Sequence, residues 1–235
     1  MKSKPEKLAP VDGSFSATQL KIILAAEKLF ASTSIESASL REIASAAEQR
    51  NHYAVQYHFG SRDGLVRAVF AHRMFQMEER RGAMLAEIER TGRLHEARAL
   101  LEVLFLPQLE LQKADGNRSY GSFLCQYLLR ERWAAYGDFG IPSPPNLDRL
   151  LTLIKERFDH LPEAVAQRRI VSGSLVFLSI LATYVDEHGE ERTLEGEESF
   201  NEALNDTLMQ IEAGLFMPMP PKANVDITRK QAALS

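Results

Sequence analysis

Apolar residues recur along this chain with the spacing of helices rather than of strands. Between residues 17 and 215 they return every three or four positions, which favours amphipathic α-helices. No sustained alternation of apolar and polar residues, bounded by Asn-Gly or Asp-Gly turns, indicates a strand. Two of the helical stretches begin with a capping box, at Ser16 and at Ser39, where the serine and a polar residue three positions later satisfy free N–H groups. The pattern predicts an all-α protein.

The expected helices form a short N-terminal group and a longer second group. The first group contains one helix from residue 17 to about 32–34 and two short helices over 40–47 and 52–59. Gly60 ends this group, and the next helix is expected to run unbroken from Arg62 to about Arg90. The remaining predicted helices span residues 94–113 with a kink at Pro107, 118–135, 147–160, 163–187 and about 200–215.

Composition excludes several classes of protein. The chain has 235 residues, of which 45% are hydrophobic, so it can bury a core and is not disordered. A single cysteine, Cys125, excludes an intrachain disulfide and fits a reducing compartment. The N-terminal residues show no signal-peptide pattern. The apolar stretch 170–185 is interrupted by serine and glycine and is too short for a membrane span, so we expect a buried helix, no membrane association and a cytoplasmic location.

Charge is unevenly distributed along the sequence. Residues 1–75 contain 10 Lys and Arg against 7 Asp and Glu, whereas the remainder contains 18 against 25. The formal net charge of -4 therefore combines a basic N-terminal segment with an acidic remainder. A nucleic-acid reader attached to an acidic body would have this distribution.

The two short N-terminal helices, joined by a tight turn behind a longer helix, are typical of a helix-turn-helix reader of double-stranded DNA. Val55 and Phe59 lie one turn apart and are the expected inward anchors of the second short helix. Asn51 and Gln56 can each bond a base edge twice, while the aromatic and basic side chains can reach phosphates or sugars. The candidate DNA-binding residues are Arg41, Arg50, Asn51, His52, Tyr53, Gln56, Tyr57, His58, Ser61 and Arg62.

Several N-terminal motifs resemble the reader domain of TetR-family transcriptional regulators. The matching runs cover residues 22–26, 29–30, 39–44 and 46–47, followed by Tyr-His-Phe-Gly-Ser-Arg-Asp-Gly-Leu over 57–65. The resemblance implies a homodimer that binds a palindromic operator, usually as a repressor, and releases it when a small molecule fills a pocket in the helical body. Three positions depart from the family pattern: Ser34 and Glu48 replace glycines, and Gln56 replaces a phosphate-contacting tyrosine.

The second group of helices is expected to supply a dimer interface and an effector pocket. Two apolar helices from each protomer can close a four-helix interface, although burial within one protomer explains the same stripes. The predicted interface residues are Ser174, Phe177, Leu178, Leu181, Val185, Phe200, Leu204, Leu208 and Ile211. Aromatic side chains with a few polar neighbours are typical of a site for an apolar or aromatic molecule, and equally of an ordinary core. The predicted pocket residues are Phe105, Leu109, Phe123, Tyr127, Trp133 and Phe177.

The resulting hypothesis is a ligand-responsive DNA-binding regulator with an arm over residues 1–15, a helix-turn-helix domain over 16–60, a helical regulatory and dimerisation domain over 61–216 and a tail over 217–235. A helical adaptor that binds a protein partner through the same N-terminal face is the alternative. No phosphate-binding glycine loop, zinc-binding helix or nucleophile motif indicates an enzyme. No cofactor or metal site is predicted, because His52 and His58 lack ligand partners at suitable spacing.

Overall fold

The computed structural model of the chain describes residues 14–51, 53–115, 119–130, 144–184 and 198–219. These residues form eleven α-helices and no strand, so the prediction of an all-α protein is confirmed. The helices are α1 (Ala17–Ser32), α2 (Leu40–Ala46), α3 (Ala54–Phe59), α4 (Arg62–Gln76), α5 (Glu78–Arg90), α6 (Ala97–Phe105), α7 (Pro107–Asp115), α8 (Ser119–Arg130), α9 (Pro145–Glu156), α10 (Glu163–Tyr184) and α11 (Phe200–Phe216).

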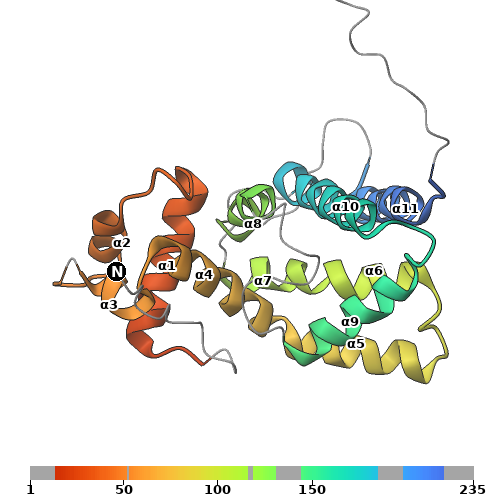
Figure 1. Cartoon of the computed structure of the whole chain (residues 1–235), viewed down its shortest axis with the longest axis horizontal. Helices are drawn as coiled ribbons and strands as arrows, with labels where there is room; N and C mark the ends of the chain where they lie inside the picture. The colour runs from red at the N-terminus through yellow and green to blue at the C-terminus, as the bar shows by residue number, and fades with distance from the viewer. Residues whose placement is uncertain (1–13, 52, 116–118, 131–143, 185–197, 220–235) are drawn as a thin grey trace, which may run out of the picture.

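The N-terminal unit, α1–α3, occupies one end of the molecule, and α4 leads from it into the body formed by α5–α11 (Figure 1). Both predicted capping boxes are present, with the Ser16 side chain accepting from Gln19 and the Ser39 side chain bonded at the start of α2. Ile22 and Phe30 of α1 are fully buried. The hydrophobic core continues from these residues into the body, so the two parts of the chain are packed together rather than linked by a free segment.

The predicted long helix over 62–90 is divided into α4 and α5 at Met77, which corrects the sequence-based expectation. Neither proline nor glycine lies at this point of the chain. The Arg81 side chain turns back along the helix, and its Nη1 donates to the main-chain oxygen of Met74 over 3.5 Å. A side chain that competes for a carbonyl of the helical ladder is a known cause of helix bending. The break at Met77 therefore coincides with burial of the Arg81 side chain, which helical periodicity in the sequence does not reveal.

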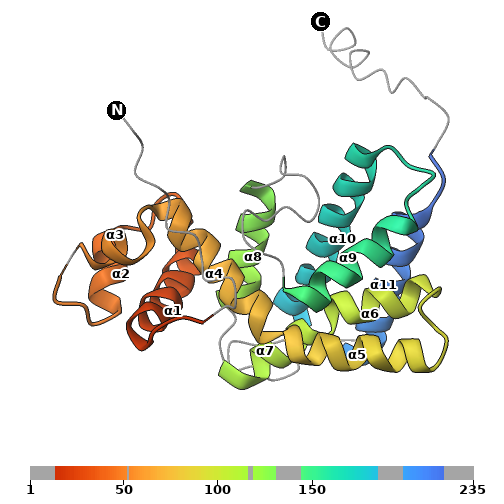
Figure 2. The same cartoon turned by 60° about the horizontal axis from the view of Figure 1, so that its bottom comes forward.

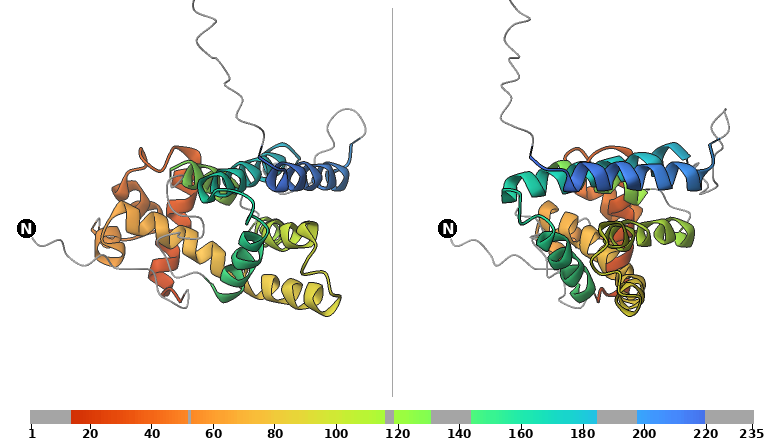
Figure 3. Two further views of the ribbon diagram at one scale, coloured as in Figure 1. Left: turned by 45° about the vertical axis from the view of Figure 1, so that its right-hand side comes forward. Right: turned by 90° about the vertical axis from the view of Figure 1, so that its right-hand side faces the viewer.

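The body helices lie in two layers. Helices α10 and α11 run side by side along one face, and α8 lies between α10 and the N-terminal helix α1 (Figures 2 and 3). Helices α5, α6 and α9 pack together on the other side. The helix predicted over 94–113 ends at Phe105 and restarts at Pro107, the residue at which a kink was expected. Helices α10 and α11 approach each other closely at Gly173, where an added Cβ would lie 3.0 Å from the side chain of Ile211.

Helix α10 is long and apolar enough over Glu163–Leu181 to cross a membrane by length and composition alone. It packs against α8 and α11, and its Phe177, Leu178 and Leu181 are buried within the chain. Phe177 also stacks on Phe105 of α6, with ring centroids 4.7 Å apart. These contacts make α10 a core helix of the body, as predicted for this stretch.

A buried ion pair joins the N-terminal unit to the body. The Nε and Nη2 atoms of Arg73 in α4 donate to the two carboxylate oxygens of Glu27 in α1 over 2.7 and 2.8 Å. Glu27 also accepts from the hydroxyl of Ser119, the first residue of α8, over 2.6 Å. The side chains of Arg73 and Glu27 are 1% and 0% exposed. Because both charges are removed from water, each depends on the other for compensation.

Replacing Glu27 with alanine is expected to destabilise the protein strongly, because Arg73 would remain as a buried charge without its carboxylate. We expect the free energy of unfolding, measured by urea denaturation, to fall by about 3–5 kcal/mol. Glu87→Ala is the control, because it breaks an ion pair with Arg90 that is exposed to solvent and should change stability little. Equal effects of the two substitutions would contradict the role assigned to the buried pair.

Candidate functional site

Helix α3 presents a polar and aromatic face to solvent. Its Val55 and Phe59 are buried, as predicted for inward anchors. Gln56 is exposed, and the side chains of Tyr53 and Tyr57 are 70% and 68% exposed. Exposure of this extent is unusual for tyrosines, whose rings normally cover apolar surface. The same helix therefore has one side fixed in the core and a second side suited to contact with another molecule.

The flanking polar residues both shape and extend this face. Asn51 accepts from the main-chain N–H of Tyr53 over 2.9 Å and so orders the start of α3. The ring of partly buried His58 meets that of Tyr57 edge-on, with centroids 4.9 Å apart. Arg41 and Arg50 are exposed and make no ion pair with the residues that the structure describes. His52, another predicted contact, lies outside the described residues.

Ser61 has the helix-capping role that the sequence predicted, whereas Arg62 has structural partners that the sequence did not predict. Ser61 caps α4 by accepting from the main-chain N–H of Gly64 over 3.0 Å. The Nη1 atom of Arg62 donates to the carbonyl oxygens of Ile35 and Ala38 over 2.7 and 2.6 Å. The Arg62 guanidinium therefore holds the connection between α1 and α2. The phosphate contact predicted for it would have to use the remaining N–H groups.

The turn between α2 and α3 contains a strained residue. Glu48 has a φ of 57°, in the left-handed region that normally favours glycine. Its side chain is held by Lys21 of α1 over 2.9 Å, and the hydrogen bond from this ammonium lowers the pKa of the Glu48 carboxyl. Ser34, the other residue that replaces a glycine of the TetR pattern, does not have a positive φ. The two positions therefore differ, since only Glu48 has the left-handed backbone conformation that glycine adopts without steric cost.

The body encloses a pocket whose position differs from the predicted one. Of the five predicted residues that the structure describes, only Phe105 lines it. Phe123 stacks on Phe30, and Tyr127 stacks on Phe70, so both are core aromatics. Leu109 packs against the small cluster that contains Phe200, and Phe177 stacks on Phe105. Trp133 lies outside the described residues.

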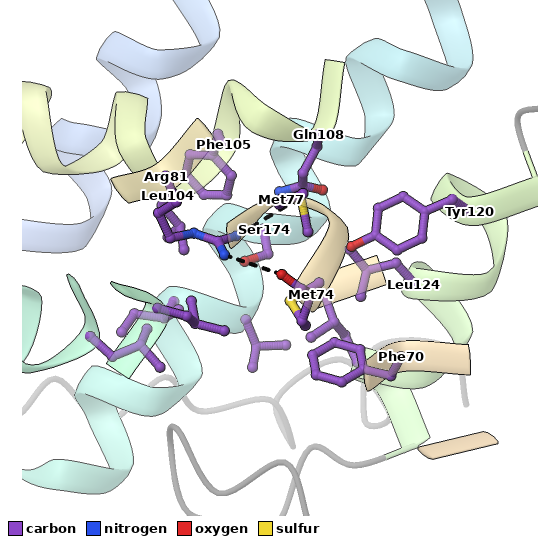
Figure 4. A pocket seen from close by; sticks show the side chains of 15 residues that line it. Phe70, Met74, Met77, Arg81, Leu104, Phe105, Gln108, Tyr120, Leu124 and Ser174 are labelled. Carbon is purple, nitrogen blue, oxygen red and sulfur yellow. Dashed lines mark hydrogen bonds between the residues drawn. The ribbon is translucent and has the colours of Figure 1, made fainter. Parts of the chain in front are cut away.

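The observed cavity has a volume of about 90 Å³ and is bounded by α4, α5, α6, α7, α8, α9 and α10 (Figure 4). Most of its wall is aliphatic or aromatic, as expected for a site that takes an apolar molecule. The lining residues are Phe70, Met74, Met77, Arg81, Leu104, Phe105, Gln108, Tyr120, Leu124, Leu128, Leu147, Leu151, Ile170, Val171 and Ser174. Sequence reasoning missed Arg81 because it follows two glutamates and another arginine, a pattern typical of a solvated face.

Three polar side chains in this apolar wall are buried. Arg81 and Tyr120 are each 1% exposed and point toward the middle of the pocket from opposite sides (Figure 4). Burial lowers the pKa of the Arg81 guanidinium, an effect that the charge of Glu78 partly offsets. Burial also raises the pKa of the Tyr120 phenol well above its usual range, so this group keeps its proton. The third is Gln108, which is nearly as well buried.

Most of the residues predicted for the dimer interface are buried within the protomer. Leu178, Leu181, Leu208 and Ile211 are buried where α10 packs on α11, so these residues are not available to a second copy. Periodicity identified an apolar stripe but not which neighbour covers it. Phe200 is also buried, Phe177 packs on Phe105, and Leu204 is partly covered, whereas Val185 lies outside the described residues.

The opposite side of the same two helices remains exposed. Val176 of α10 is 40% exposed, and the exposed Ser172 lies one turn before it on the same helix. A groove of about 460 Å³ runs between the two helices here, lined in part by Ser172, Gly173 and Gly214. This outer face (Ser172, Gly173, Val176, Gln210 and Gly214) belongs to α10 and α11, which run along one edge of the molecule in Figure 3.

Relief of the left-handed strain at Glu48 should stabilise the N-terminal unit. We expect Glu48→Gly to raise the melting temperature by about 2 °C, despite the loss of the Lys21 contact, because glycine adopts this conformation without steric cost. Ser34→Gly is the matched control and should lower the melting temperature, since Ser34 is not strained and its hydroxyl accepts from the N–H of Ser37. The prediction fails if differential scanning calorimetry shows the same sign for both.

No known family model and no curated protein matches this sequence.

Proposed function

We propose that this protein is a DNA-binding transcriptional regulator of the TetR type, in which the N-terminal unit is a helix-turn-helix reader and the body binds a small effector. The observation that carries the proposal is the exposed face of α3, on which Tyr53, Gln56 and Tyr57 project from a helix anchored by Val55 and Phe59. A helix of this kind fits the major groove, where an amide bonds base edges and phenols contact the backbone. A regulator that binds chromosomal DNA would act in the cytoplasm.

The protein is proposed to act as a homodimer through the outer face of α10 and α11. Reading successive turns of one DNA face requires two α3 helices about 34–36 Å apart, which a symmetric dimer supplies. The exposed Val176 gives this face an apolar centre, and the adjacent Gly173 and Gly214 allow close approach of a second pair of helices.

Helices α4 and α8 both line the effector pocket and contact the N-terminal unit, which suggests a mechanism for release of DNA. Helix α4 supplies Phe70 and Met74 to the pocket, and α8 supplies Tyr120 and Leu124. Both helices also hold α1, α4 through Arg73 and α8 through Ser119. An effector that separates α4 from α8 would move these attachment points and alter the spacing of the two readers.

Further contacts run from α8 directly to the N-terminal unit. Gln126 donates to the carbonyl oxygen of Phe30 and accepts from the N–H of Ile35, each over 2.8 Å. Arg130 contacts Asp63 over 2.5 Å at the start of α4. In the proposed repressor, an effector shifts the population toward a conformation that does not fit the operator, and a coupling of about 1–3 kcal/mol is sufficient.

Selection of bound duplexes from a random DNA pool tests the function directly. We expect the full chain to enrich a palindromic sequence and to bind it with an affinity that falls steeply between low and moderate salt, because phosphate contacts release counterions. Failure to prefer any sequence over random duplex would reject the proposal and favour a protein-binding adaptor.

Substitutions on the exposed face of α3 should affect the selected operator in different ways. Gln56→Ala is expected to relax discrimination at one base pair by about 1–3 kcal/mol, whereas Tyr57→Ala should weaken binding to all sequences. Arg41→Ala should reduce the salt dependence, and Arg90→Ala, an exposed arginine at the far end of α5, is its control. Fluorescence anisotropy with matched and mutated operators measures these effects. Unchanged binding by all three α3 and α2 variants would show that another surface contacts DNA.

The oligomeric state should depend on the outer face of α10 and α11. We expect Val176→Glu to convert the dimer into monomers in sedimentation-velocity experiments, because a charge would be buried at the centre of the interface. Leu129→Glu changes a similarly exposed leucine on α8 and should leave the dimer intact. A dimer that tolerates Val176→Glu would place the interface elsewhere, and a wild-type monomer would exclude this arrangement altogether.

A further inference from the structure

The pocket contains three buried polar atoms that have no hydrogen-bond partner among the described residues. They are Nε of Arg81, Oε1 of Gln108 and the hydroxyl oxygen of Tyr120. The three side chains come from α5, α7 and α8 and line the same cavity (Figure 4). Leaving such groups unsatisfied costs stability, and a charged group costs most. Their convergence in one apolar cavity indicates a polar group on the molecule that the cavity takes.

The available edge of Arg81 indicates the shape of that group. Its Nη1 atom is occupied on one side, by Glu78 over 3.4 Å and by the carbonyl oxygen of Met74 over 3.5 Å. On the other edge, among the parts of the chain that the structure describes, Nε has no partner and Nη2 donates only to the sulfur of Met77 at 3.9 Å. Two parallel N–H groups on one edge of a guanidinium match the two oxygens of a carboxylate.

The charges around the pocket favour a single negative charge on the ligand. Glu78 already lies beside Arg81, and the nearby Arg73 is neutralised by Glu27. A dianion such as a phosphate monoester would therefore face one arginine whose charge is partly compensated. A monocarboxylate needs less positive charge, and the protonated Tyr120 hydroxyl opposite can donate to it. Gln108 adds an acceptor for a hydroxyl or N–H group on the ligand.

The size and lining of the cavity define the rest of the molecule. A volume of about 90 Å³ is smaller than the roughly 150 Å³ of a cavity known to hold benzene. Met74 and Met77 form part of the wall, and unbranched thioether side chains adapt readily to a ligand. The remaining wall is aliphatic and aromatic, so the body of the ligand should be apolar and small.

We propose that the effector is a small apolar monocarboxylic acid, whose carboxylate binds the Nε and Nη2 edge of Arg81 and accepts from the Tyr120 hydroxyl while its hydrocarbon part fills the cavity. This inference names the ligand class of the proposed regulator, so its regulatory meaning rests on the proposed function. The binding site itself rests only on the pocket.

Binding of matched acids and amides to the full chain tests the assignment without DNA. The probes are butyrate, isobutyrate and pentanoate, each compared with its primary amide by thermal shift and isothermal titration calorimetry. We expect at least one acid to bind at least about tenfold more tightly than its amide, because a charge-assisted bidentate contact is lost in the amide. The preference should persist in 0.5 M NaCl, since buried pairs are weakly screened.

Two substitutions locate the bound carboxylate. Arg81→Met should abolish the preference for acid over amide without lowering the melting temperature of the ligand-free protein, because it removes a poorly compensated buried charge. Tyr120→Phe should weaken acid binding, whereas Tyr127→Phe, a buried tyrosine on the same helix outside the pocket lining, should not. A lower melting temperature for Arg81→Met with unchanged acid preference would assign Arg81 a structural role and overturn the proposal.

Absence of binding by every acid, or equal affinity for acids and amides, would also overturn it. These results are separable from failure of the proposed function. A protein that selects an operator but ignores the acids keeps the DNA-binding proposal and loses this one. A protein that binds the acids through Arg81 but selects no DNA keeps this site and loses the regulator.

Discussion

The Glu27 carboxylate is the constraint that fixes how the two parts of this chain are joined. It lies on α1, and it is bound at the same time by Arg73 of α4 and by Ser119 of α8. Because both charged side chains are buried, a displacement of either helix leaves part of a charge without its partner in the interior. Such an interaction allows only a small number of discrete arrangements, as the proposed switch between two conformations requires.

Helix α8 is the structural element that connects the interior of the body with the N-terminal unit. Tyr120 and Leu124 on this helix line the pocket. Gln126 contacts the main chain of Phe30 in α1 and of Ile35 after it. Arg130 contacts Asp63 in the first turn of α4. A ligand that moved α8 by a fraction of a helical turn would alter contacts at both ends of the helix. The pocket and the exposed face of α3 are thus linked by packed helices and directional hydrogen bonds, without a flexible segment between them.

Individual residues in this protein often serve a stabilising role at the same place as a proposed binding role. Arg62 secures the α1–α2 connection through two carbonyl oxygens. Asn51 orders the first turn of α3, and Glu48 accepts a strained conformation that a glycine would adopt freely. The order of α3 therefore depends on its flanks as well as on the two apolar anchors, and effects of substitution there combine stability with recognition.

Local pattern was sufficient to determine the helical class, both capping boxes, the inward anchors Val55 and Phe59 and the exposed side of α3, because each depends on residues within one or two helical turns. It could not determine the break at Met77, the buried position of Arg81 or the partner of the α10 stripe. Those features depend on which helix packs beside which, and an apolar stripe or a charged run has the same periodicity whether it faces its own chain, a second copy or solvent. Only the tertiary arrangement brought Arg81, Gln108 and Tyr120 from three helices into one cavity.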